Sequence, residues 1–141
     1  MKYGRLCTDG GARGNPGPAA SAAVLFEVDA EGQIKNETAK TTRYVGIATN
    51  NQAEYEAVII GLQKARECGF DMMEVLMDSE LIVEQMNGNY RVRNEELAKK
   101  FLEVHRLIQS FRRVTFRHVR REENRQADAL VNKTIDEALG G

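Results

Sequence analysis

Four carboxylate side chains in this sequence stand where they could do chemistry. Asp9 and Asp78 each follow a short apolar segment typical of a β-strand, and Glu54 and Asp128 each fall in the first turn of a predicted helix. If the two strands are parallel neighbours, both aspartates lie at the carboxyl edge of the sheet, where open α/β sheets bind ligands. Ligand sets made only of oxygen suit hard cations such as Mg²⁺ or Mn²⁺. The four acids therefore predict a metal site.

The spacing around Glu54 and Asp128 predicts that both side chains point toward the sheet. Steps of three and four residues from Asp128 lead to Val131 and Ile135, which must face the core. A buried carboxylate without a partner is costly, and four acids at one edge would repel one another unless cations neutralised them. The corresponding positions after Glu54 are Val58, Gly61 and Ala65.

Each acid also has a structural interpretation, and these interpretations stay open when the acids are taken singly. Asp9 could serve a turn, and Asp78 could be the N-cap of a helix. Glu54 could complete a capping box with Asn51. Asp128 could complement the positive end of its helix dipole. The convergence of all four on one edge is what favours the metal site.

The elements that must position these acids are three strands followed by alternating helices and strands. Thr49 or Asn50 can cap a helix at 50–68, and Thr49 with Gln52 fits a capping box. Further helices are predicted at 79–86, after Asn94, and after Asn124. The order predicts one α/β domain over the whole chain, with a mixed sheet flanked by helices. Strands are predicted at 3–8, 20–28, 34–45, 72–77 and 114–119.

Several other kinds of catalytic site are excluded because their sequence motifs are absent. The loop predicted at 10–18 is no dinucleotide fingerprint, because Pro16 and Pro18 stand where a helix should open. A P-loop, a nucleophile elbow and a Cys/His zinc pattern are all absent. His105 and His118 fall inside a predicted helix and a predicted strand. We expect both to be packed, hydrogen-bonded side chains.

The composition describes an ordinary globular chain. Hydrophobic residues make up 42% and charged residues 29% of its 141 residues, which excludes disorder and coiled coil as descriptions of the whole chain. The net charge of −1 indicates neither a nucleic-acid nor a membrane partner. No apolar run is long enough to span a bilayer, and no secretory signal is visible. With Cys7 and Cys68 isolated and expected to be buried, reduced thiols, we expect a cytoplasmic protein without membrane contact.

Four sequence blocks resemble the signature blocks of type 1 ribonuclease H, in the family's order. The resemblance implies a five-stranded mixed sheet of order 3-2-1-4-5 with helices on both faces. It implies that the four acids form a metal-binding tetrad holding two Mg²⁺ ions, with Mn²⁺ as an alternative. In that tetrad Asp9 bridges the ions, Glu54 and Asp78 complete one shell, and Asp128 joins the other. The blocks are TDGGARGNPGPA (8–19), TNNQAEYEA (49–57), MDSELIV (77–83) and ENRQADALV (123–131).

The activity implied by the resemblance is that of a metal-dependent endoribonuclease. It would hydrolyse the RNA strand of RNA–DNA hybrids to 5′-phosphate and 3′-hydroxyl ends, as a monomer. Glycines without side chains would let the loop backbone approach the minor groove, where the 2′-hydroxyls lie. Asparagines would bond to the groove, and Thr49 and Asn94 would hold a phosphate of the DNA strand. The substrate-binding residues implied are Gly10, Gly11, Asn15, Thr49, Asn50, Asn51 and Asn94.

The sequence departs from the family pattern in two places. The stretch 87–94 stands where some members carry a long basic protrusion, so we expect hybrid affinity to come from elsewhere. Residues 112–125 hold six arginines and two glutamates and are a candidate, although such a run can also be a solvated surface. His118 aligns best with the end of the last strand, so the family's mobile histidine would be absent and Arg120 or Arg121 would stand in. In a second alignment His118 is that histidine.

Two alternatives to a hybrid-specific nuclease stay open at this point. One is a nuclease of the same fold that also cuts double-stranded RNA. The other is a hybrid-binding module without catalysis, against which the four intact acids argue.

Overall fold

A computed structural model describes residues 1–141 of the protein. Its five strands form one sheet in the order β3-β2-β1-β4-β5, which confirms the predicted order. Strand β1 pairs antiparallel with β2 and parallel with β4, and β4 pairs parallel with β5. The strands are β1 (Tyr3–Ala12), β2 (Gly17–Val28), β3 (Ile34–Ala48), β4 (Met72–Met77) and β5 (Arg113–His118). The helices are α1 (Asn50–Glu67), α2 (Glu80–Met86), α3 (Glu95–Ile108), the 3-10 helix η1 (Arg121–Asn124) and α4 (Arg125–Ala138).

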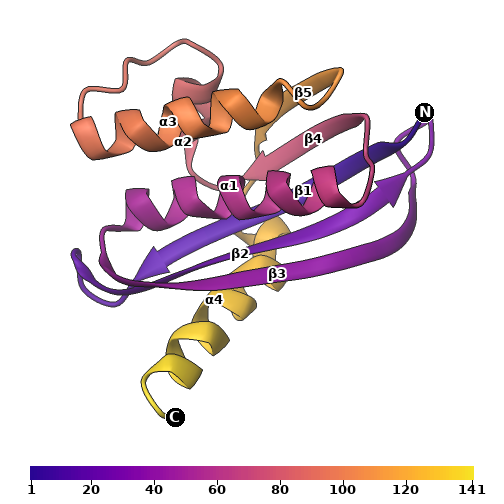
Figure 1. Ribbon diagram of the computed structural model, residues 1–141. Helices are drawn as coiled ribbons and strands as arrows, with labels where there is room; N and C mark the ends of the chain where they lie inside the picture. The colour runs from indigo at the N-terminus through magenta and orange to yellow at the C-terminus, as the bar shows by residue number, and fades with distance from the viewer.

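The helices cover the two faces of the sheet unequally. Figure 1 shows α1, α2 and α3 on one side and α4 alone crossing the other. The first side holds a cluster of 19 buried apolar residues, because α1 turns its small-residue stripe to the sheet. A Cβ on Gly61 would lie 2.6 Å from Leu6, so glycine lets α1 approach β1 closely. Helix α4 packs through a cluster of only four buried residues: Ala20, Ala22, Val131 and Ile135.

The strands around the predicted loop at 10–18 are longer than predicted. Strand β1 runs on through Ala12, so Asp9 lies within the strand rather than at its end. The glycines that suggested a loop pair with β2 instead, Gly10 opposite Ser21 and Gly11 opposite Ala20. The connection that remains is only residues 13–16.

Two further expectations concern membrane-spanning helices and the state of the two cysteines. No helix combines the length and the apolar character that crossing a membrane requires. Cys7 and Cys68 are separate free thiols, but both are only partly buried rather than fully buried as expected.

Candidate functional site

The structure brings the four predicted acids together at the carboxyl edge of the sheet. Strands β1 and β4 are parallel with Thr8 opposite Met77, so the next residues, Asp9 and Asp78, lie side by side where β4 ends. Asp9, Glu54 and Asp78 each offer one carboxylate oxygen within 4.8 Å of the others. Together with Asp128, whose side chain is 33% exposed, they line an open cavity of about 430 Å³.

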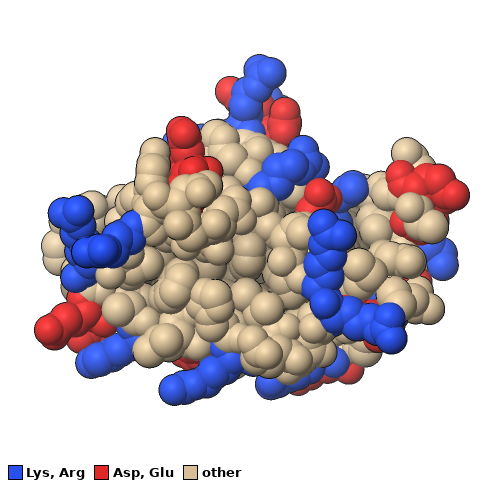
Figure 2. Space-filling model, turned by 90° about the horizontal axis from the view of Figure 1, so that it is seen from above, with Lys and Arg blue, Asp and Glu red and all other residues tan.

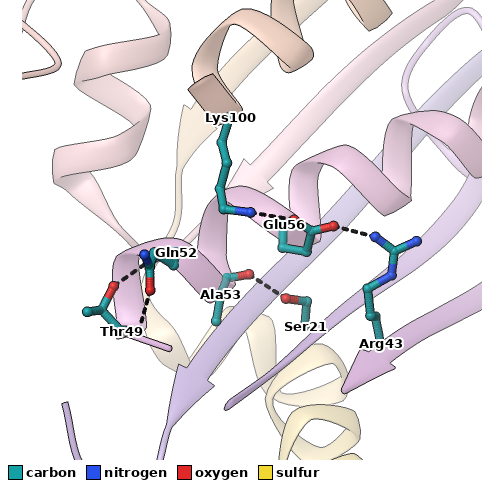
Figure 3. Close-up of polar contacts among 7 residues, drawn as sticks. All are labelled: Ser21, Arg43, Thr49, Gln52, Ala53, Glu56 and Lys100. Atoms are coloured by element: carbon teal, nitrogen blue, oxygen red, sulfur yellow. Dashed lines mark hydrogen bonds and ion pairs between the residues drawn. The ribbon is translucent and has the colours of Figure 1, made fainter. Parts of the chain in front are cut away.

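The first turn of α1, which carries Glu54, is fixed by hydrogen bonds. The hydroxyl of Thr49 accepts from the backbone N–H of Gln52, and the side chain of Gln52 accepts from the backbone N–H of Thr49 (Figure 3). This is the predicted capping box. The buried hydroxyl of Ser21 on β2 donates to the carbonyl oxygen of Ala53 at 2.5 Å. The residue just before Glu54 is therefore bonded to the sheet.

Gly10 sets the distance between β1 and this turn. A Cβ at Gly10 would lie 2.3 Å from the carbonyl of Ala53 and 2.4 Å from the backbone nitrogen of Glu54. A Cβ at Gly11 would meet only Val131, at 3.6 Å. Gly10 therefore has a packing reason to lack a side chain, because α1 occupies that space. This close contact places Glu54 beside Asp9.

Burial and mutual repulsion raise the pKa values of three acids. Burial raises the pKa of Asp9 to about 8, helped by the charges of Asp78, Asp128 and Glu54. Burial also raises the pKa of Glu54 to about 7, against the hydrogen bond with Ser79. Asp78 is shifted upward for the same first reason, so its pKa lies above the usual range for aspartate. Clustered carboxylates that resist ionisation are a donor set that fits a divalent cation, which would supply the missing positive charge.

Asn124 is a site residue whose place the sequence did not reveal. It was expected to cap the last helix, but it makes no capping bond to α4. Instead it is 2% exposed and donates from Nδ2 to the carbonyl oxygen of Thr8 at 2.7 Å. Its amide also lowers the pKa of Asp78, against the effect of burial. The signal available was its spacing, since Asn124 lies one helical turn before Asp128.

Two of the predicted asparagines join the β1–β2 connection to α1. Oδ1 of Asn50 accepts from the backbone N–H of Ala12 at 2.8 Å, and Oδ1 of Asn15 accepts from the backbone N–H of Asn50 at 3.0 Å. Of the two, only Asn50 lines the acidic cavity. Arg13 and Asn132 also line it, and neither was predicted as a site residue.

Three of the other predicted substrate residues, Thr49, Asn51 and Asn94, lie outside the cavity lining. Asn94 caps α3, where its Oδ1 accepts from the backbone N–H of Leu97 at 3.1 Å, just as Thr49 caps α1. Asn51, in the first turn of α1, is partly buried and makes no side-chain hydrogen bond. Gly11 does line the cavity, as does Gly10.

The arginine-rich run does not form one patch. Arg121 lines the cavity and lies 3.5 Å from Asp128, but Arg117 pairs with Glu74. Arg113 lines a groove at the opposite edge of the sheet. Figure 2 shows basic and acidic side chains interspersed around the rim of the α3 side, with neutral atoms across its middle. The arginines are therefore distributed along β5 and the segment after it, and Arg121 is the one that lines the acidic cavity.

The two histidines are exposed rather than packed and hydrogen-bonded, so that expectation is wrong for both. His105 contacts the ring of Phe101 in a tilted arrangement, with ring centroids 4.4 Å apart and the ring planes at 59°. His118 is the last residue of β5, as the preferred alignment predicted. It pairs in register with Met77, and its charge lowers the pKa of Asp78. Arg120 is exposed and follows closely, outside the cavity lining.

Comparison with known proteins identifies sequence relatives. A protein-family model described as "Reverse transcriptase-like" matches residues 7–134. A Ribonuclease H of Hydrogenovibrio crunogenus is 31% identical, over 99% of this chain and 100% of its own. A Ribonuclease HI of Halobacterium salinarum is 42% identical over 92% of this chain. The chain spans 63% of that relative's length and 35% of the length of mycobacterial relatives that are equally similar.

Solved structures with the same fold are also close in sequence. The N-terminal RNase H domain of a Mycobacterium tuberculosis protein aligns with a TM-score of 0.91 and 38% identity, over 99% of this chain and 98% of that one. The crystal structure of LC11-RNase H1 in complex with an RNA/DNA hybrid aligns with a TM-score of 0.85 and 41% identity. That match covers 96% of this chain and 99% of the other.

Proposed function

The chain belongs to the type 1 ribonuclease H family, and on this premise we propose that it hydrolyses the RNA strand of RNA–DNA hybrids as a metal-dependent endoribonuclease. The observation that carries the proposal is the meeting of Asp9, Glu54 and Asp78 within 4.8 Å, with Asp128 lining the same cavity. A purely structural role for these residues would not explain why four acids lie together and why the pKa values of three of them are raised. A relative that binds an RNA/DNA hybrid in its crystal structure supports the choice of substrate.

The four acids are the residues that would hold the cations, two Mg²⁺ ions with Mn²⁺ as an alternative. Asp9 is the most buried of the four and feels the charges of the other three, so it is the natural shared ligand. Bound there, the cations would supply an activated water and charge neutralisation for the leaving 3′-oxygen, as in two-metal phosphodiester hydrolysis. That chemistry gives 5′-phosphate and 3′-hydroxyl ends.

The chain's own residues orient the reacting strand. The acids must release their protons before they can ligate, and the elevated pKa values of Asp9 and Glu54 oppose that release near neutral pH. Asn124 bonds to the backbone of β1 just before Asp9, and its amide favours the ionised form of Asp78. Arg121 stands over Asp128 at the rim of the cavity, where it can meet a phosphate oxygen of the incoming strand.

Recognition of the hybrid would use both sides of α1. The Oδ1 atoms of Asn15 and Asn50 each accept a hydrogen bond from a backbone N–H. Each Nδ2 group is therefore free to donate to the minor groove. Asn51 and the backbone of Gly10 and Gly11 would complete these contacts. The caps Thr49 and Asn94 would face a phosphate of the DNA strand, since helix N-termini favour anions. The enzyme would act as a monomer in the cytoplasm.

A cleavage assay on matched duplexes tests the proposal. Labelled RNA–DNA, RNA–RNA and DNA–DNA duplexes of one sequence are incubated with Mg²⁺, Mn²⁺ or EDTA. We expect cleavage of the RNA strand of the hybrid only, and none in EDTA. Equal cleavage of RNA–RNA would favour the broader nuclease, and hybrid binding without cleavage under any metal would favour the binding module. Either result would overturn the proposal.

A second substrate tests how the RNA strand is recognised. A hybrid whose RNA strand carries a few central 2′-deoxy substitutions should be cut only outside that patch. Each unpaired buried polar group costs on the order of 1–3 kcal/mol, so two or three lost contacts suppress cleavage by about a hundredfold or more. Efficient cleavage inside the patch would contradict recognition of the 2′-hydroxyl.

A further inference from the structure

A buried carboxylate outside the acidic cavity connects three elements. Glu56, in the second turn of α1, is only 8% exposed. It pairs with Arg43 of β3 and accepts from Nζ of Lys100 on α3 at 2.8 Å (Figure 3). Glu56 and Lys100 are 44 residues apart in the sequence, so their ion pair joins two helices rather than two turns of one.

The ion pair of Glu56 and Lys100 lies near the N-termini of both helices. Figure 1 shows α1 and α3 side by side, with their N-terminal ends at the same end of the molecule. Glu56 and Lys100 each lie about 10 Å along the helix axis from the cap of their own helix, at 1.5 Å per residue. Apolar packing between helices tolerates small sliding, whereas a buried ion pair requires one geometry. The caps at these two N-terminal ends are Thr49 and Asn94.

We propose that Glu56 is a positioning residue for substrate binding, whose pair with Lys100 sets the separation of Thr49 and Asn94. The inference rests on the proposed function, in which these two caps hold a phosphate of the DNA strand. Glu56 itself touches no substrate. The charge of Lys100 is compensated by Glu56, so Lys100 acts through the helix position rather than as a phosphate ligand.

The sign of the effect of Glu56→Gln separates positioning from simple electrostatics. The variant loses one negative charge, so charge alone predicts tighter binding of a polyanion. Positioning predicts weaker binding, by about five- to tenfold in Kd for a hybrid in EDTA measured by fluorescence anisotropy. With Mg²⁺, KM should rise by a similar factor while kcat stays within about twofold, because the acids are untouched. The variant should fold, since Arg43 and Lys100 both reach solvent.

Glu96→Gln is the matched control. It removes the same charge from the first turn of α3, but Glu96 pairs only with Lys99 of its own helix, at 3.3 Å. It should bind the hybrid as tightly as the unmodified chain or more tightly. If Glu56→Gln behaves like Glu96→Gln, the inference is wrong.

Variants on α3 test the same pair from its other side. Lys100→Gln and Lys99→Gln remove equal charge, but only the first breaks the connection to α1, so it should weaken binding several-fold more. Lys100→Arg should restore affinity. Equal losses in the two glutamine variants, or no rescue by arginine, would contradict positioning. Failure of the unmodified chain to cut or bind the hybrid would instead overturn the proposed function, and the two failures are therefore distinguishable.

Discussion

Replacing Asp9 with asparagine should abolish cleavage and, without metal, make the protein more stable. Asparagine is nearly isosteric with aspartate but carries no charge, so the cavity keeps its shape while its shared metal ligand is lost. The gain in stability follows from the surroundings of Asp9, which is 7% exposed and faces three other acids. Without metal, the negative charge of Asp9 repels those of the other three acids, and the substitution removes this repulsion.

The sign of the pH dependence follows from the direction of the shift. The pKa of Asp9 is about 8 in the folded protein, against 3.8 for an ordinary aspartate, so the folded chain retains a proton that the unfolded chain releases. The associated stability is present below pH 4 and is lost as the pH rises through about 8. At pH 7 the cost is about 4 kcal/mol at 1.36 kcal/mol per pH unit.

The expected net gain is smaller than this cost. The asparagine amide must itself be buried in the same place, and its desolvation offsets about 1 kcal/mol. A net stabilisation of about 2–3 kcal/mol raises the Tm of a chain of this size by about 5–10 °C. The gain should be largest near pH 8 and should vanish near pH 4, where the aspartate is protonated in both states.

Thermal unfolding in EDTA at pH 4, 7 and 8 measures the effect, and a hybrid cleavage assay with Mg²⁺ measures the loss of activity. Glu31→Gln is the control, because it removes the same charge from the exposed β2–β3 hairpin at the far edge of the sheet. It should leave both Tm and cleavage unchanged. A Tm for Asp9→Asn at or below that of the unmodified chain at pH 8 would refute the repulsion argument. Cleavage at the unmodified rate would remove Asp9 from the mechanism.

Three further results are expected. Gly10→Ala should destabilise the fold by about 2 kcal/mol or more in urea unfolding, because its Cβ meets backbone at 2.3 Å, whereas Gly11→Ala should cost far less; equal costs would contradict the packing role. Replacing Arg120 and Arg121 with alanine should reduce hybrid cleavage more than His118→Ala, and a folded His118→Ala that loses turnover at saturating substrate would reverse this assignment. Mg²⁺ should raise Tm in scanning fluorimetry more at pH 8 than at pH 6, because metal binding requires ionised acids; a pH-independent shift would argue against a carboxylate site.

The convergence of the acids could be predicted because it depends on short-range patterns, whereas the order of the strands in the sheet was implied by the resemblance to type 1 ribonuclease H. The apolar runs before Asp9 and Asp78 fix two strands, and helical spacing fixes the inward face at Glu54. The capping box of Thr49 and Gln52 is likewise a local pattern, and the structure has it as expected. These signals lie within one or two turns of chain, where the sequence is most informative.

The errors arose where long-range contacts override local preference. Gly10 and Gly11 look like turn residues, yet β2 extends β1 past them, and α1 fills the space that a side chain at Gly10 would take. Asn124 has the type of a helix cap but is bound to a carbonyl 116 residues away. The arginines at 112–125 are adjacent in the sequence, yet β5 carries Arg113 and Arg121 to opposite ends of the strands. None of these contacts has a counterpart in nearby sequence.

The thin anchorage of α4 has a consequence for local stability. The fourth acid, Asp128, lies on a helix whose contact with the sheet is a cluster of four buried residues, two on α4 and two on β2. The core on the opposite face has 19 buried residues. The ion pairs that add to it, Arg13 with Asp136 and Arg121 with Asp128, are exposed and contribute little. Detachment of α4 should therefore cost less free energy than global unfolding. Such an opening would carry Asp128 away while Asp9, Glu54 and Asp78 stay in place, and native-state amide exchange should be faster in α4 than in α1.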